Sequence, residues 1–241
     1  MSVCTKCGDY GIDGGCPKCG KDSRNVIELE TIQNVEQFVN ECENSFIPHK
    51  FIGVYWNRSY VEVDHEKYVT NPNFKRFLDN CNKLHESFIN GNPLASSVYL
   101  FAPPRFGKEY LVYSCMQIAL NSGLTIAPYL DTIELKRLLI LGGQNPSYKL
   151  YGKIDYDSYM MADVLFVKVT HTAYVKDAYS ILLELISRRS RLNKPTYVIS
   201  ELTLKELTHD ANPYVSTVWS DVSGVNLNKL KYPAVIGFRP N

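Results

Sequence analysis

The chain has 241 residues, of which 45% are hydrophobic and 21% charged, and its formal net charge is +1. This composition is typical of a folded globular protein with one substantial domain and a small appendage, and so small a net charge restricts any nucleic-acid contact to a local basic patch. No apolar run approaches the roughly 18 residues of a membrane span, and the polar N-terminus does not resemble a signal peptide, so we expect a cytoplasmic protein with no membrane partner.

Four of the seven cysteines lie in the first twenty residues with the spacing C-x2-C-x8-C-x2-C. Each C-x-x-C pair is followed at once by a glycine, as in the tight turns that direct two thiolates toward one zinc ion. We therefore predict a structural zinc head over residues 1–22, which is too short to fold on a core of its own. A disulfide pair or a redox motif is the alternative, although the absence of a secretory segment argues against disulfides. The predicted zinc ligands are Cys4, Cys7, Cys16 and Cys19.

The next part of the chain contains two predicted helices. Apolar spacing in residues 23–50 indicates a linker that becomes a short helix and ends at Ile47-Pro48. Asn71-Pro72-Asn73 is typical of a helix N-terminus, and apolar residues recur at helical spacing over residues 74–88. We expect His85 on this second helix to be structural, because no second metal ligand lies one turn away. The cysteines expected in the core are Cys42, Cys81 and Cys115.

The stretch from Val98 to Leu111 predicts strand, turn and helix, the arrangement of a P-loop. The motif G-x-x-x-x-G-K-[ST] is altered, because Ala102 replaces the first glycine and Glu109 replaces the hydroxyl residue that holds Mg²⁺. Arg105 also places a side chain where glycine would free the backbone. We therefore expect weak ATP binding at most, without Mg²⁺ and without hydrolysis. The vestigial nucleotide-binding residues are Pro104, Arg105, Gly107, Lys108 and Glu109.

Strands and helices alternate through the rest of the chain, which predicts an α/β fold with a right-handed, mostly parallel sheet. The helix that follows Thr132 is expected to end at Gly142-Gly143. The predicted segments are a helix over 109–122, a strand over 124–130, a helix over 132–141, a strand over 163–169, a helix over 175–191, and strands over 195–200 and 235–239.

Two segments combine features of single-stranded DNA binding. Tyrosines and lysines are interleaved in residues 145–161, and aromatic rings among lysines can stack on bases, although tyrosines half-buried on the domain surface are the alternative. Three arginines gather at the end of the helix predicted over 175–191, where the helix dipole by itself favours cations and phosphate contact is the alternative. The candidate DNA contacts are Lys149, Tyr151, Lys153, Arg188, Arg189 and Arg191.

Several segments, in order along the chain, resemble the AAA+ helicase loaders of the DnaC/DnaI/IstB group. Residues 162–169, 180–189 and 193–202 are similar to the core motifs of this family, and the cysteine-rich front end is similar to the zinc-bearing head of its DnaI branch. The resemblance implies an AAA+-like P-loop domain over residues 51–241, joined by the linker 23–50 to the zinc head. It also implies a hexameric replicative helicase as the partner, with single-stranded DNA as a further one.

The chain departs from this family at the positions of the residues that hydrolyse ATP. Lys168 and Val169 stand at the two Walker B acids, Glu201 stands at the sensor asparagine, and residues 220–222 lack the arginine finger. Since phosphoryl transfer needs all of these groups, the resemblance implies a loader or adaptor that does not hydrolyse ATP. Two alternatives stay open: an interaction adaptor in a transcription or transposition complex that uses the zinc head, and an atypical ATPase of the family. The acids of such an ATPase would be Asp155, Asp157 or Asp163.

Two of the altered positions suggest a compensation. Glu109 and Lys168 fall at the positions that would hold the metal between them, so we expect the Lys168 ammonium to occupy the cation position and to pair with the new carboxylate. A buried or half-buried pair of this kind adds little net stability, but loss of one partner costs about 3–5 kcal/mol. Lys168→Ala is therefore expected to lower thermal stability more than a change at a surface lysine does. The alternative is that Lys168 points outward from an edge strand.

Overall fold

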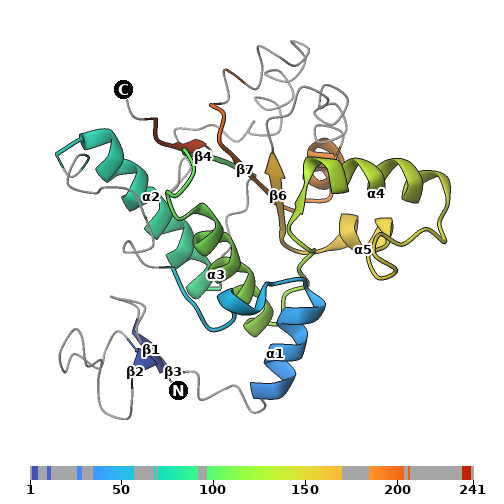
Figure 1. Cartoon of the computed structure of the whole chain (residues 1–241), viewed down its shortest axis with the longest axis horizontal. Coiled ribbons are helices and arrows are strands. Elements are labelled where there is room, and N and C mark those ends of the chain that lie inside the picture. Colours follow the sequence, from blue (N-terminus) through green and yellow to red (C-terminus); the bar gives the residue numbers. More distant parts are fainter. Residues whose placement is uncertain are drawn as a thin grey trace.

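The computed structural model describes residues 2–4, 10–11, 26–28, 35–56, 68, 70–91, 97–169, 185–203, 206 and 235–239. Near the N-terminus, β1 (Ser2–Cys4), β2 (Tyr10–Gly11) and β3 (Val26–Glu28) form an antiparallel sheet in the order β2-β1-β3. The larger part of the described chain is a second sheet with helices on both of its faces (Figure 1). Among the described helices, none combines the length and apolar character needed to cross a membrane.

The described strands of the larger sheet are all parallel and lie in the order β5-β6-β7-β4-β8. This arrangement confirms the predicted parallel α/β sheet, and it brings the carboxyl ends of all these strands to one edge. The strand predicted over 124–130 is shorter than expected, because only a single bridge from Ile126 to Val164 precedes β5. The strands are β4 (Val98–Phe101), β5 (Leu130–Asp131), β6 (Leu165–Val169), β7 (Thr196–Ser200) and β8 (Val235–Gly237).

The helices predicted over 74–88, 109–122 and 132–141 are all present, and a further helix over 156–161 was not predicted. The Asn71 side chain caps α2 by accepting a hydrogen bond from the Asn73 amide at 2.9 Å, which confirms the predicted helix start. Of the helix predicted over 175–191, residues 185–191 are helical and residues 175–184 lie outside the described residues. The bounds are α1 (Val35–Asn44), η3 (His49–Phe51, a 3₁₀ turn), α2 (Pro72–Ile89), α3 (Lys108–Asn121), α4 (Thr132–Gln144) and α5 (Tyr156–Met161).

Each face of the sheet has its own hydrophobic core, because successive side chains of a strand point to opposite faces. Leu100 and Phe166 pack with α2 and α3, whereas Tyr99 and Val167 pack with α4, α5 and the start of helix 185–191. Figure 1 shows these two groups of helices on opposite sides of the central strands. Phe38 and Cys42 of α1 belong to the first core, so the predicted boundary at residue 51 divides residues that share one core.

The predicted end of α4 is wrong. The helix continues through Gly142 and Gly143 to Gln144. A Cβ atom on Gly142 would lie 3.0 Å from the Cβ of Tyr156, so this glycine allows α5 to approach the helix closely. Here glycine serves helix packing, which outweighs its weak helix propensity.

Buried polar side chains attach α3 to the segment that precedes α2. Gln117 is fully buried, accepts a hydrogen bond from the Gly53 amide at 2.6 Å and donates one to the Phe51 carbonyl at 2.9 Å. Ser114 Oγ accepts from the Trp56 amide and lies 2.7 Å from Nε2 of His85. Burial lowers the pKa of His85 to about 4, so this histidine is a neutral core residue, as expected.

The remaining cysteines behave as small hydrophobic residues. Cys42, Cys81 and Cys115 are each at most 1% exposed and carry free thiols, which confirms the prediction. Burial raises the pKa of each thiol, so the reactive thiolate is disfavoured at all three positions.

Candidate functional site

The turn between β4 and α3 joins a strand to a helix, the arrangement that the P-loop motif predicted. Gly107 caps the start of α3 in the left-handed region with φ of 72°, where glycine carries no steric penalty. Arg105 is also left-handed, with φ of 69°. For a residue with a Cβ atom this conformation costs roughly 1–2 kcal/mol. The loop therefore keeps its conformation although one of its residues opposes it.

Aromatic packing holds this loop in place. Phe106, in the middle of the turn, is only 2% exposed. Its ring centroid lies 5.4 Å from that of Phe238, directly after β8, and 5.9 Å from that of Phe74 on α2. The sequence pattern did not indicate this anchor, although a large apolar residue inside a P-loop motif is a signal that could have been noticed.

Lys108 is turned back onto its own loop. Its Nζ donates hydrogen bonds to the carbonyls of Ala102 at 2.5 Å and Pro103 at 2.6 Å. Burial lowers the pKa of Lys108 to about 8, and the nearby carboxylates of Glu201 and Glu109 partly oppose this shift. The Lys108 ammonium, which in a P-loop reaches toward phosphate, is therefore hydrogen-bonded to carbonyls of its own loop.

Glu109 and Lys168 form an ion pair across the mouth of the site. Lys168 Nζ lies 2.7 Å from Oε1 of Glu109, and β6 is an interior strand, flanked by β5 and β7. The Glu109 side chain is 46% exposed and the Lys168 side chain is 39% exposed. The predicted loss of about 3–5 kcal/mol in folding stability on removal of one partner is therefore too large, because it requires a pair shielded from water. Water screens a pair of this exposure to roughly 0–1 kcal/mol. Its role as a replacement for a metal ion stays a prediction.

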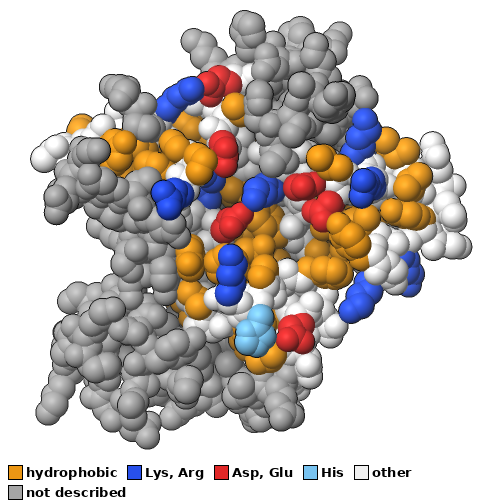
Figure 2. All heavy atoms as spheres, in the orientation of Figure 1, with side chains coloured by type: hydrophobic (Ala, Val, Ile, Leu, Met, Phe, Trp, Pro, Cys, Tyr) orange, Lys and Arg blue, Asp and Glu red, His pale blue; other side chains and the backbone are white. Residues whose placement is uncertain are grey.

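The carboxylate next to Lys168 in the sheet is used to cap a helix. Asp131 pairs with Lys168 in the strand register, but its carboxylate caps α4 by accepting from the amides of Ile133 and Glu134, each at 2.9 Å. Within the described ranges, no three His, Cys, Asp or Glu side chains are arranged to hold a metal ion. Figure 2 shows acidic and basic side chains interleaved over the middle of this face of the molecule.

The acids considered for an atypical ATPase have other partners or positions. Asp155 caps α5 by accepting from the Ser158 amide at 2.8 Å, and Asp157 is exposed on that helix. Asp163 precedes β6, five residues or roughly 16 Å of strand from Lys168. Hydrogen bonds from Thr125 and Lys194 lower the pKa of Asp163 to about 2. Asp155 and Asp163 therefore stabilise the fold at a cap and at the opposite edge of the sheet.

The prediction that Arg189 contacts DNA is wrong. The side chain is fully buried and donates hydrogen bonds to the carbonyls of Met160 at 2.7 Å, Ala162 at 2.8 Å and Pro195 at 2.8 Å. Burial lowers its pKa to about 10. The sequence held a signal for this position, because Arg189 follows the inward-facing Leu185 by four residues and so lies on the same side of the helix.

The other DNA candidates lie at two places. Lys149 and Lys153 are exposed on a turn closed by a bridge from Leu150 to Ile154, and Arg188 and Arg191 are exposed on helix 185–191. Tyr151 is 57% exposed, but its hydroxyl donates to Glu134 of α4 at 2.5 Å. Binding of DNA by these residues stays a prediction.

The predicted zinc site falls largely outside the described residues. Cys7, Cys16 and Cys19 belong to the undescribed segments, as do residues 220–222 at the arginine-finger position. The backbone of Cys4 ends β1, and the chain returns antiparallel at Tyr10, opposite Val3. A set of four thiolates suits zinc, and zinc binding by this segment stays a prediction.

Solved structures of other proteins are similar to this chain in fold. No protein-family model and no curated protein matches the chain. A solved structure assigned as a primosome component of Streptococcus pyogenes serotype M3 is 15% identical with a TM-score of 0.52, and the match covers 86% of this chain and 97% of that one. The structure of DnaI is 14% identical with a TM-score of 0.50, covering 78% and 93%.

A structure of the replication initiator DnaA bound to AMPPCP and single-stranded DNA is 11% identical with a TM-score of 0.49. The match covers 77% of this chain but about half, 51%, of DnaA. The likeness to DnaI and to the primosome component covers nearly their whole length and shows that this chain shares the fold of these two proteins.

Proposed function

We propose that this chain is a loader or adaptor for a hexameric replicative DNA helicase and that it works in the cytoplasm without hydrolysing ATP. The observation that carries the proposal is the Glu109–Lys168 ion pair at the mouth of a retained P-loop turn. The DnaI-like fold supports the choice of partner. A scaffold of this kind, with a lysine at the metal position, suits binding better than phosphoryl transfer.

A loader needs no turnover of its own in order to act on a ring. If the adaptor binds an open helicase ring more tightly than a closed one, binding shifts the ring toward the open state. Release would then come from the helicase's own ATP cycle or from another partner. The size of the effect is limited by the difference between the two affinities, which is a measurable quantity.

In this proposal the zinc head makes the contact with the helicase. The donor set Cys4, Cys7, Cys16 and Cys19, with its paired C-x-x-C spacing, supports zinc binding. Because so short a module has no core, zinc would supply most of its folding free energy. Single-stranded DNA would be contacted by the exposed cations Lys149, Lys153, Arg188 and Arg191.

A pull-down tests the partner. The intact chain, with zinc content measured by atomic absorption, is expected to retain a purified hexameric replicative helicase. Cys4→Ser is expected to lose both zinc and helicase, whereas Ser23→Ala, just beyond the cysteines, retains both. Helicase binding that survives the loss of zinc would contradict the role of the head, and no binding by the intact chain would contradict the proposal.

A steady-state ATPase assay tests the chemistry and separates the proposal from an atypical ATPase. With helicase bearing an inactivated ATPase and single-stranded DNA present, we expect no turnover above that of the same mixture without this chain. Turnover that depends on the chain and disappears in Lys108→Ala would contradict the proposal.

A further inference from the structure

Helix α4 exposes apolar side chains on the face that points away from the sheet. It buries Leu135 and Leu138 inward, yet Ile133, Ile140 and Leu141 are 45%, 38% and 43% exposed. On α2 the exposed positions after the first turn are charged instead, namely Lys75, Arg76, Lys83 and Glu86. A helix that is apolar on both faces is typical of one that packs against structure on both sides.

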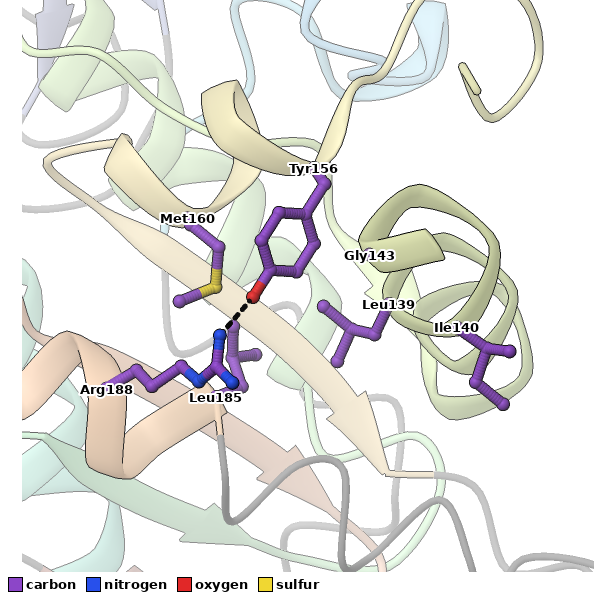
Figure 3. Close-up of a pocket in the computed structure, with 7 residues that line it drawn as sticks. All are labelled: Leu139, Ile140, Gly143, Tyr156, Met160, Leu185 and Arg188. Atoms are coloured by element: carbon purple, nitrogen blue, oxygen red, sulfur yellow. Dashed lines mark hydrogen bonds between the residues drawn. The ribbon is translucent and has the colours of Figure 1, made fainter. Parts of the chain in front are cut away.

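Beside this helix lies a hollow of about 280 Å³ between α4, α5 and helix 185–191. Figure 3 shows Leu139 and Ile140 of α4 on one side of it, and Tyr156 with Arg188 on the other. No atom lies within 4 Å of the position that a Cβ on Gly143 would take, so α4 leaves this wall open where a side chain would fill it. The space is suited to a large apolar side chain from outside.

The charged side chain that the described residues contribute to the hollow is a cation. Of the described residues that line it, Arg188 alone is charged, and its NH1 group donates to the hydroxyl of Tyr156 at 2.8 Å. Arg137 adds a second exposed cation on α4, between Ile133 and Ile140. A surface of this kind is complementary to apolar anchors flanked by carboxylates.

We propose that this groove, formed by the exposed face of α4 and the hollow next to it, binds an amphipathic helix of a partner protein that carries acidic side chains beside its apolar face. Ile133 and Ile140 are seven residues apart, about 10.5 Å along the axis, which matches two turns of an incoming helix. A second copy of this chain fits less well, because a two-fold contact through this face would bring Arg137 and Arg188 toward their own copies. The proposal does not depend on the helicase as the partner.

The test uses the full chain and two synthetic helical peptides with leucines at positions i, i+3, i+4 and i+7. One peptide has glutamates flanking the leucines, and the other has lysines at the same positions. Fluorescence anisotropy is expected to show at least tenfold tighter binding of the glutamate peptide. When the glutamate peptide is bound, the backbone amides of residues 132–161 and 185–191 are expected to exchange hydrogen more slowly.

Charge reversal then tests the site. Arg188→Glu is expected to reverse the preference toward the lysine peptide, while Arg76→Glu, an exposed arginine on the other side of the sheet, leaves it unchanged. Equal affinities for the two peptides, or a preference that Arg188→Glu does not move, would overturn the proposal. Slower hydrogen exchange at another surface would also overturn the proposal. So would sedimentation equilibrium that shows the chain to be a dimer and shows that Ile140→Asp dissociates it.

Discussion

The turn after β4 and the carboxyl end of β6 meet at one edge of the sheet. The turn keeps the strand-to-helix backbone of its motif, whereas the end of β6 keeps only its position in the sheet. The turn keeps its backbone, with Arg105 and Gly107 both left-handed and Phe106 packed beneath them. The end of β6 keeps its position but carries Lys168, whose ammonium contacts Glu109. Backbone shape is fixed by many packing contacts and survives single changes, whereas a metal site depends on the few atoms that bind the ion.

The largest effect is expected at the core that supports the turn. The pKa of His85 is about 4 in the folded protein and about 6.5 when unfolded, so the unfolded state binds more protons between these values. Stability is therefore lost as the pH falls from 6.5 to 4, by up to about 3 kcal/mol because each pKa unit is worth about 1.4 kcal/mol. Urea unfolding measured across this range checks it.

His85→Asn is the matched variant, since it keeps a hydrogen-bonding side chain beside Ser114 but does not titrate in this range. Its stability should fall less steeply from pH 6.5 to 4. An equal slope in both proteins would mean that His85 is not the group responsible.

The next effect concerns the left-handed glycine of the turn. Gly107→Ala is expected to destabilise the protein by about 1–2 kcal/mol, because a Cβ atom is strained at φ of 72°. Gly143→Ala, inside α4 with open space around its Cβ position, should instead stabilise by up to about 1 kcal/mol. Thermal melting of both variants decides this, and a neutral Gly107→Ala would mean that the turn is not held in its P-loop shape.

A smaller effect of opposite sign is expected at Arg105. Relative to Arg105→Ala, Arg105→Gly should gain about 0.5–1 kcal/mol, because glycine relieves the left-handed strain but loses more conformational entropy on folding. The alanine variant removes the side chain's own interactions, so the comparison isolates the backbone. If the glycine variant unfolds at a lower urea concentration than the alanine variant, residue 105 is not held in the left-handed conformation in solution.

The smallest effect is expected for the ion pair itself. A double-mutant cycle of Glu109→Ala and Lys168→Ala should give a coupling energy below about 1 kcal/mol that decreases with added salt, since both side chains are more than a third exposed. Lys153→Ala, an exposed lysine elsewhere, should change stability by less than about 0.5 kcal/mol. No coupling at low salt would show that the contact does not persist in solution.

Local sequence patterns predicted the elements of the fold and part of the site. Strand, turn and helix around Gly107 follow from one motif, and the contact of Glu109 with Lys168 was expected from the resemblance, because the two residues stand at the family's metal-holding positions. The burial of Arg189 depends on carbonyl acceptors at Met160, Ala162 and Pro195, which no local pattern brings together. The exposure of the ion pair depends in the same way on what the fold leaves uncovered.

A crystal structure of the protein grown with ATP and Mg²⁺ tests the central claim most directly. We expect Lys168 Nζ to remain on the carboxylate of Glu109, with no metal ion between β6 and the turn. An ordered triphosphate on Gly107 and Lys108 with Mg²⁺ coordinated beside it would contradict the claim that the chain keeps the scaffold but not the chemistry.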